Sequence, residues 1–196
     1  MAARGKSRRS RLYGQREKLI AMIRLRRTAV LVAPLSALCI LATLPRAAAA
    51  SETAPRMADR IVVHKKDRIM ELMHNGQVLE TYKIALGGQP LGGKTRQGDH
   101  RTPEGVYVID RRNRHSQFHR SLHISYPNAA DRQRAHKLGV SPGGDIFIHG
   151  LPNGYGWIGA AHRDRDWTDG CIAVTDQEIE EIWRLVPDGT PVEIRP

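Results

Sequence analysis

The sequence predicts a mainly β domain of sandwich or barrel type, with one or two short helices. Three observations indicate this fold class. Short apolar or alternating runs recur from Arg60 to the C-terminus, Asn75-Gly76 separates two of them, and one segment near the C-terminus has the periodicity of an amphipathic helix. Many short strands joined by turns, with few helices, bury their apolar faces by folding a sheet on itself or by stacking two sheets.

The expected strands are short runs separated by turn residues. In chain order they cover residues 61–64, 68–74, 77–86, 106–109, 122–126, 146–149, 172–174 and 191–194. Asn75-Gly76 predicts a tight hairpin between the second and third runs, because both residue types tolerate positive φ angles. The glycine-rich stretch 87–98 and the turn Thr102-Pro103-Glu104-Gly105 predict a long loop before the fourth run.

One helix is strongly indicated, at residues 176–185. Thr175 is a suitable N-cap, with Glu178 three residues later as the capping-box partner, and an apolar stripe follows at helical spacing. Residues 129–139 could form a second short helix. The segment from Gly150 to Gly170 has no regular pattern, and a loop of this length in a compact domain usually carries a functional site.

The basicity of the chain belongs to its first fifty residues. The chain has 31 Lys+Arg against 20 Asp+Glu, a formal net charge of +11. Residues 1–50 hold eleven of the basic residues and one acid, Glu17, so the other 146 residues have a net charge of +1. A nearly neutral domain has no surplus of cations to follow a phosphate backbone, which argues against nucleic acid as a partner.

These first fifty residues have the organisation of a secretory signal peptide. Residues 1–27 are basic, residues 28–44 are apolar, and Ala47–Ala50 supply small residues for cleavage. The alternative is an uncleaved membrane anchor, but the apolar run contains Pro34 and is shorter than the ~20 residues that a spanning helix needs. We therefore expect residues 1–50 to direct export across the inner membrane, to the periplasm and cell wall.

The remaining chain reads as a polar linker, residues 51–59, followed by one domain, residues 60–196, that does not span the membrane. Signal cleavage would remove Cys39 and leave Cys171 as the only cysteine. A lone thiol in an oxidising compartment indicates a reactive role, the alternative being a buried and inert cysteine.

One constellation is typical of thiol chemistry. His149-Gly150 closes an expected strand, and Thr168-Asp169-Gly170-Cys171 precedes the next one. A thiol needs a neighbouring base to become a thiolate at neutral pH, and histidine is the usual partner. Glycine beside the nucleophile lets a substrate carbonyl approach and leaves backbone N–H groups for an oxyanion.

Together these residues resemble the YkuD-type L,D-transpeptidase domain of bacterial cell-wall enzymes. Besides the constellation above, the resemblance includes the glycine-rich segment with Lys94, Gly98-Asp99 with the Thr102–Gly105 turn, Tyr126-Pro127-Asn128, and Pro142-Gly143-Gly144. Each piece alone is weak, but in this order and with a lone exported cysteine they are highly specific. The resemblance runs from Arg60 to the C-terminus and implies the family's β-sandwich or barrel-like fold.

The resemblance implies a cysteine acyltransferase that acts on peptidoglycan stem peptides. Cys171 is then the nucleophile, His149 its general base, and backbone N–H groups around Gly170 and Cys171 the oxyanion hole. The thiolate would attack the third-residue carbonyl of a stem tetrapeptide and release D-Ala. An amine of a second stem would resolve the thioester into a 3–3 cross-link, or a lipoprotein lysine would be anchored. The resemblance implies no metal and no organic cofactor.

Two positions depart from the usual motif of the family. Asp169 stands where histidine is usual, and Ala173 stands where Arg or Asn is common. Asp169 could orient an imidazole, meet a substrate ammonium group, or be an ordinary turn residue. Some relatives with alanine at the position of Ala173 hydrolyse the lipoprotein–peptidoglycan link, so an L,D-carboxypeptidase or a lipoprotein–peptidoglycan amidase stays open as an alternative.

The loop before Cys171 supplies the remaining candidates. The expected substrate-binding residues are Gly150, Thr168, Asp169, Arg163 and Trp157. Arg163 could instead belong to a solvated run of charges, and Trp157 could instead pack in the core. His162 is the alternative base, but His149 is preferred because a base on a rigid strand end is better positioned than one on a loop.

Two other classes of protein fit parts of the pattern. A metal-binding protein would use His149, His162 and Cys171 as ligands, but their spacing is loose and no fourth ligand is evident. A non-catalytic wall-binding module on the same fold would not need Cys171. The complete His-Gly and Thr-x-Gly-Cys set favours an enzyme over both.

Overall fold

The computed structural model describes residues 56–196. The predicted signal peptide lies outside this range, as does the first part of the predicted linker. The end of that linker differs from the prediction. Ala58 is buried and its N–H donates to the Leu185 carbonyl at 2.8 Å, while the Asp59 N–H donates to the Met73 carbonyl at 2.9 Å. The folded domain therefore includes both residues.

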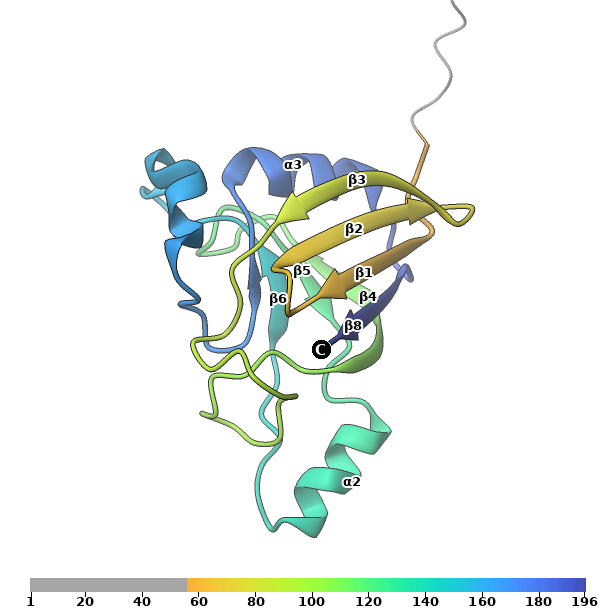
Figure 1. The fold of residues 1–196 in the computed structure, drawn as a ribbon, viewed down its shortest axis with the longest axis vertical. Coiled ribbons are helices and arrows are strands. Elements are labelled where there is room, and N and C mark those ends of the chain that lie inside the picture. The colour runs from red at the N-terminus through yellow and green to blue at the C-terminus, as the bar shows by residue number, and fades with distance from the viewer. Residues whose placement is uncertain (1–55) are drawn as a thin grey trace, which may run out of the picture. The chain divides into compact units, whose positions relative to one another are not determined.

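Eight strands form one continuous sheet (Figure 1), which confirms the predicted mainly β fold. The strands are β1 (Arg60–His64), β2 (Ile69–His74), β3 (Gln77–Lys83), β4 (Gly105–Asn113), β5 (Ser121–Ile124), β6 (Ile146–His149), β7 (Ile172–Ala173) and β8 (Pro191–Arg195). Their order across the sheet is β3-β2-β1-β8-β4-β5-β6-β7. The first and last strands of the domain thus lie side by side, β1 parallel to β8.

The sheet bends at β4, which is longer than predicted. Residues 105–108 of β4 pair with β8, and residues 109–113 pair with β5, with a register shift between Ile109 and Arg111. A bulge of this kind bends the strand and increases its local twist. The two halves of the sheet therefore face one core, which β1, β2, β4, β5, β6, β8 and the C-terminal helix all fill with aliphatic side chains.

The Asn75-Gly76 hairpin forms as predicted, with φ angles of 51° and 76°. The strand after it is shorter than predicted and ends at Lys83. The chain then crosses to the other edge of the sheet, where Ala85 bridges Ala173 and Gly87 bridges Thr168. This crossing brings the start of the glycine-rich loop against the segment that carries the lone thiol.

In the part of the chain that the structure describes, two α-helices and one 3-10 helix accompany the sheet, and α3 packs its apolar side chains into the core. Helix α3 (Asp176–Leu185) has the predicted bounds and the predicted capping box at its first turn, and α2 (Ala129–Lys137) ends two residues earlier than predicted. The predicted loop from Gly150 to Gly170 contains a 3-10 helix, η1 (Gly156–Asp164). Among residues 56–196, no helix has the length and apolar character needed to cross a membrane.

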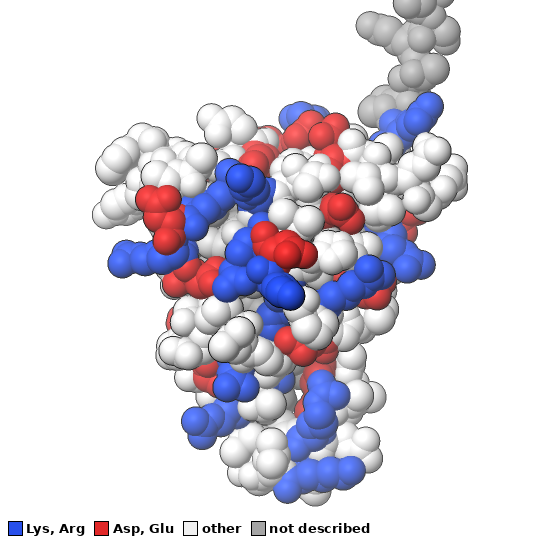
Figure 2. All heavy atoms as spheres, in the orientation of Figure 1, with Lys and Arg blue, Asp and Glu red and all other residues white. Residues whose placement is uncertain are grey.

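Charged side chains of both signs are interspersed over most of the face drawn in Figure 2. Many are paired, for example Arg112 with Asp188 at 2.7 Å and Arg120 with Glu180 at 2.8 Å. This distribution agrees with the near-neutral charge of the sequence after residue 50.

Candidate active site

Cys171 lies directly before β7, on the face of the sheet that also carries His149. In the parallel pair of β6 and β7, Ile148 lies opposite Ile172 and His149 opposite Ala173. Side chains alternate along a strand, so residues 171 and 173 share a face with His149. Cys171 and His149 both line one pocket of about 400 Å³. The structure therefore brings together the two side chains that the sequence predicts as nucleophile and base.

The imidazole of His149 is buried and held in one orientation. Its Nδ1 atom lies 2.7 Å from the carbonyl oxygen of Gly150, and its ring stacks at a tilt on Phe118 with centroids 4.5 Å apart. A carbonyl oxygen only accepts, so Nδ1 carries the proton and Nε2 is the unprotonated nitrogen. Burial lowers the pKa of His149 to about 4, so the ring is neutral at pH 7 and able to accept a proton.

The Cys171 thiol is also protonated at neutral pH. Burial raises the pKa of Cys171, while a hydrogen bond from the Phe147 backbone and the positive charge of Lys94 act in the opposite direction. The sulfur lies 3.7 Å from the Asp145 carbonyl oxygen. A neutral thiol beside a neutral imidazole suits general-base catalysis, in which the proton moves as the sulfur attacks.

The turn before Cys171 is held by one hydroxyl group. The Thr168 hydroxyl donates to the Cys171 carbonyl at 2.8 Å and accepts from the Gly170 N–H at 3.1 Å. Gly170 has a φ of 123°, and a Cβ there would lie 2.5 Å from the Arg101 carbonyl oxygen, so only glycine fits. The oxyanion role predicted for the Gly170 N–H requires it to exchange the Thr168 hydroxyl for the substrate oxygen.

The other predicted residues divide between this pocket and its surroundings. Thr168 and Asp169 line the pocket. Gly150 is a packing position, because a Cβ there would lie 2.7 Å from Asp176 Oδ1. Arg163 and Trp157 are not brought to Cys171. Arg163 pairs with Glu178 of α3, and Trp157 on η1 is 81% exposed.

His162, the alternative base, faces a second and largely apolar pocket. That pocket is lined by residues of η1 and its flanks, and Trp167 is common to both pockets. Burial lowers the pKa of His162, and within the described part of the chain neither of its ring nitrogens has a hydrogen-bond partner. The three ligands of the metal-binding alternative are therefore divided between two pockets, and within residues 56–196 no three His, Cys, Asp or Glu side chains are grouped as a metal site requires.

Several lining residues were not predicted from the sequence. Ser121 and Phe147 enter the pocket through strand pairing, since Ser121 lies opposite His149 in the pair of β5 and β6. Phe118 enters from the segment before β5 and packs on the His149 ring. The alternation of β5 and β6 could have placed Ser121 and Phe147 on this face. No sequence signal pointed to His100, whose Nδ1 lies 2.7 Å from Asp169 Oδ1.

Comparison with known proteins identifies the family of this chain. The YkuD family model, described as the L,D-transpeptidase catalytic domain, matches residues 58–194. YafK of Escherichia coli strain K12, itself named only as a provisional L,D-transpeptidase, is 32% identical over 133 residues, which cover 64% of this chain and 46% of YafK. The chain thus spans about half the length of this relative.

Two solved structures share the fold. The helical cell shape determining protein Pgp2 from Campylobacter jejuni has a TM-score of 0.55 and 25% identity, over 72% of this chain and 48% of its own. Bd1075 from Bdellovibrio bacteriovorus has a TM-score of 0.50 and 23% identity, over 74% of this chain and 50% of its own. The family model covers more than half of the sequence, and the chain belongs to the YkuD family of L,D-transpeptidase catalytic domains.

Proposed function

We propose that this chain is an exported peptidoglycan L,D-transpeptidase that uses Cys171 as its nucleophile. The observation that carries the proposal is the shared pocket of Cys171 and His149, in which the Nδ1 bond to Gly150 leaves Nε2 as the proton acceptor. The signal-like residues 1–50 support export to the periplasm and cell wall.

In the first half-reaction the Cys171 sulfur attacks the third-residue carbonyl of a stem tetrapeptide. The thiol proton passes to His149 Nε2 as the carbon–sulfur bond forms, and backbone N–H groups at Gly170 and Cys171 stabilise the oxyanion. The bond to the terminal D-Ala then breaks, and His149 returns the proton to the leaving amine. The product is a thioester on Cys171 and free D-Ala.

In the second half-reaction an amine attacks the thioester and restores the thiol. A side-chain amine of a second stem gives a 3–3 cross-link, and the lysine of an outer-membrane lipoprotein gives an anchored lipoprotein. His149 Nε2 removes a proton from the attacking amine and delivers it to the departing sulfur. Neither step needs a metal or an organic cofactor.

Hydrolysis is the second candidate, and Ala173 favours it. Ala173 is fully buried opposite His149, and its methyl side chain offers no hydrogen-bonding group beside the base. An acceptor amine would have one fewer group to bind it, whereas water needs none. The enzyme would then be an L,D-carboxypeptidase or a lipoprotein–peptidoglycan amidase.

Product analysis separates these activities. The reduced full-length protein is incubated with a disaccharide-tetrapeptide, and the products are identified by mass spectrometry, with Cys171→Ala as the control. Cross-linked dimers would establish a transpeptidase, and tripeptide alone a carboxypeptidase. Release of lipoprotein from lipoprotein-linked sacculi would establish the amidase. Turnover by Cys171→Ala, or no activity on any of these substrates, would contradict the proposal.

A further inference from the structure

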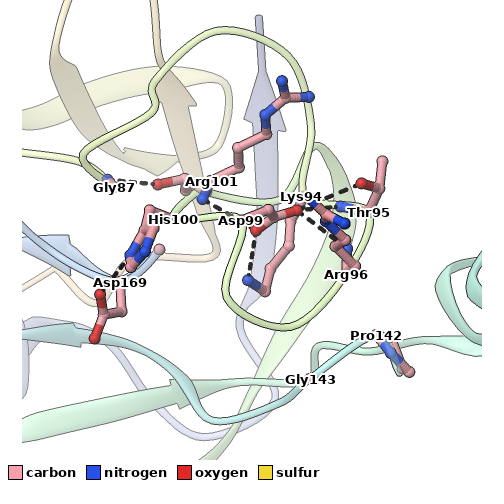
Figure 3. Close-up of polar contacts among 12 residues, drawn as sticks. Gly87, Lys94, Thr95, Arg96, Asp99, His100, Arg101, Pro142, Gly143 and Asp169 are labelled. Carbon is pink, nitrogen blue, oxygen red and sulfur yellow. Dashed lines mark hydrogen bonds and ion pairs between the residues drawn. The ribbon is translucent and has the colours of Figure 1, made fainter. Parts of the chain in front are cut away.

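A histidine just after the glycine-rich stretch 87–98 contacts the turn that carries the nucleophile. His100 Nδ1 lies 2.7 Å from Oδ1 of Asp169, a residue 69 positions later in the chain and two before Cys171 (Figure 3). Among the described residues, His100 is the one hydrogen-bond partner of the Asp169 side chain. This single contact joins two segments that are far apart in the sequence.

The position of His100 is fixed by the residue before it. The Asp99 carboxylate accepts hydrogen bonds from Lys94 Nζ at 2.8 Å and from the backbone N–H groups of Thr95 and Arg96 at 2.8 and 3.1 Å (Figure 3). The side chains of Lys94 and Asp99 are both buried, and these hydrogen bonds lower the pKa of Asp99 to about 2. The Asp99 carboxylate thus ties residues 94–96 to the residue directly before His100.

The backbone of His100 is held from the opposite side as well. Its φ is 52°, and its carbonyl oxygen accepts from the Gln89 N–H at 3.0 Å. A Cβ on Gly87 would lie only 2.2 Å from that oxygen, so the two backbones are in direct contact. Buried contacts therefore fix the His100 backbone, while its imidazole is exposed and extends toward Asp169.

The negative charge of Asp169 lies close enough to Cys171 to affect its reactivity. Its carboxylate is largely exposed and lines the Cys171 pocket, and its negative charge raises the pKa of the thiol. The other charged groups near this pair are Lys94, Arg96, Asp99 and Arg101 on the loop and Asp145 before β6. An unheld Asp169 side chain could turn toward the sulfur and oppose thiolate formation.

We propose that His100 is a positioning residue that acts through Asp169. Its Nδ1–H holds the Asp169 carboxylate at the loop, which keeps that charge away from the sulfur and steadies the Thr168–Cys171 turn. The inference rests on the proposed function in one respect only, that Cys171 is the reacting group. It gives the loop a role in catalysis without contact between His100 and the substrate.

The test measures the reactivity of Cys171 without any peptidoglycan substrate. Iodoacetamide alkylation of the full-length protein is followed between pH 6 and 10 by mass spectrometry of the Cys171 peptide. His100→Ala and His100→Gln should slow alkylation at pH 7 about tenfold and move the profile to higher pH. His100→Asn places an amide N–H where Nδ1 was and tolerates the positive φ, so it should stay within about twofold of the native rate.

A second background shows whether the effect passes through Asp169. In Asp169→Ala, the further change His100→Ala should have no effect on the alkylation rate, because the carboxylate that His100 holds is gone. His136→Ala on α2 is the matched surface control and should behave as native. An equal loss in both backgrounds, or a native rate for His100→Ala, would overturn the inference.

The same variants separate this inference from the proposed function. If stem peptides fail as substrates while alkylation follows the expected pattern, the positioning role holds and the substrate assignment is wrong. If stem peptides are turned over while the alkylation rate does not depend on His100, the substrate assignment holds and the positioning role is wrong. Urea unfolding of each variant identifies any that lose the fold. If His100→Ala is among them, the alkylation rates of His100→Asn and Asp169→Ala are compared with that of the native protein instead.

Discussion

His149 donates its Nδ1 proton to the carbonyl oxygen of the next residue, Gly150, at a distance of 2.7 Å. This short local contact decides which ring nitrogen can act as a base. With Nδ1 protonated and the ring neutral, the free lone pair is on Nε2, and the imidazole needs no carboxylate to set its tautomer. The nucleophile and base therefore form a pair whose third partner is backbone.

His149→Ala should lower the rate of Cys171 acylation by about 10³-fold, within the usual range for loss of a general base. His162→Ala should slow it by less than about tenfold, because His162 lies in the neighbouring pocket beyond Trp167. Single-turnover kinetics followed by intact mass gives both rates. A slow His162→Ala and a near-native His149→Ala would show that the base has been assigned to the wrong histidine.

Burial of neutral His149 makes stability depend on pH in a defined window. The unfolded chain binds a proton at this residue below pH about 6.5, whereas the folded chain does so only near the pKa of about 4. Between these values the unfolded state holds more protons, so the free energy of unfolding falls as pH is lowered, by up to about 3 kcal/mol at the acid end.

Urea unfolding at pH 7.5, 6, 5 and 4.5 checks this dependence, with His149→Gln as the variant that cannot titrate. The native-minus-variant difference in the free energy of unfolding should shrink steadily from pH 6.5 to 4.5. His162 contributes in the same direction, since burial lowers its pKa too, but it is present in both proteins. A difference that does not vary with pH would mean that His149 is not buried as described.

Gly87→Ala should lower both stability and the reactivity of Cys171, although Gly87 is distant from Cys171 in the sequence. Its new Cβ would meet the His100 carbonyl oxygen at 2.2 Å and force the loop away from the Thr168–Cys171 turn. Gly88→Ala is the matched control, because its Cβ would make only ordinary contacts near 3.9 Å. Equal urea midpoints and alkylation rates for the two variants would contradict the close contact.

Much of the fold could be predicted from local pattern, because the signals were local. The Asn75-Gly76 turn, β6 and the capped helix α3 depend on residues within a few positions of each other. The 3-10 helix η1 was missed because its glycine-rich sequence has no helical period. The bulge in β4 was missed because it arises where the strand changes partner from β8 to β5, and this change depends on residues far away in the sequence.

The site was predictable only in part, because local sequence patterns do not encode contacts between distant segments. Cys171 and His149 follow from chemistry that few residue types can perform. The contact between His100 and Asp169 depends instead on how the chain crosses the sheet after β3, and no local pattern encodes that crossing. Arg163 had the right chemistry for a substrate carboxylate, but folding pairs it with Glu178 of α3.

Breaking the buried pair of Lys94 and Asp99 should destabilise the domain, and loss of Asp99 should cost more stability than loss of Lys94. Asp99→Ala leaves a buried ammonium group and several backbone N–H groups without an acceptor, and should cost about 3 kcal/mol or more. Lys94→Met should cost less, because the carboxylate keeps its backbone donors. Lys137→Met on the surface of α2 is the control and should change stability by less than about 0.5 kcal/mol. Urea unfolding ranks the three, and a reversed order would contradict the account of this loop.

The most direct measurement is the intact mass of the protein within seconds of mixing with a disaccharide-tetrapeptide. We expect a covalent adduct with the mass of the disaccharide-tripeptide acyl group, mapped to Cys171, together with one equivalent of D-Ala. Cys171→Ala should show no adduct while keeping a near-native urea midpoint, since it replaces a small side chain with a smaller one. D-Ala release by Cys171→Ala, or an adduct on another residue of the native protein, would contradict the central claim that Cys171 is the nucleophile.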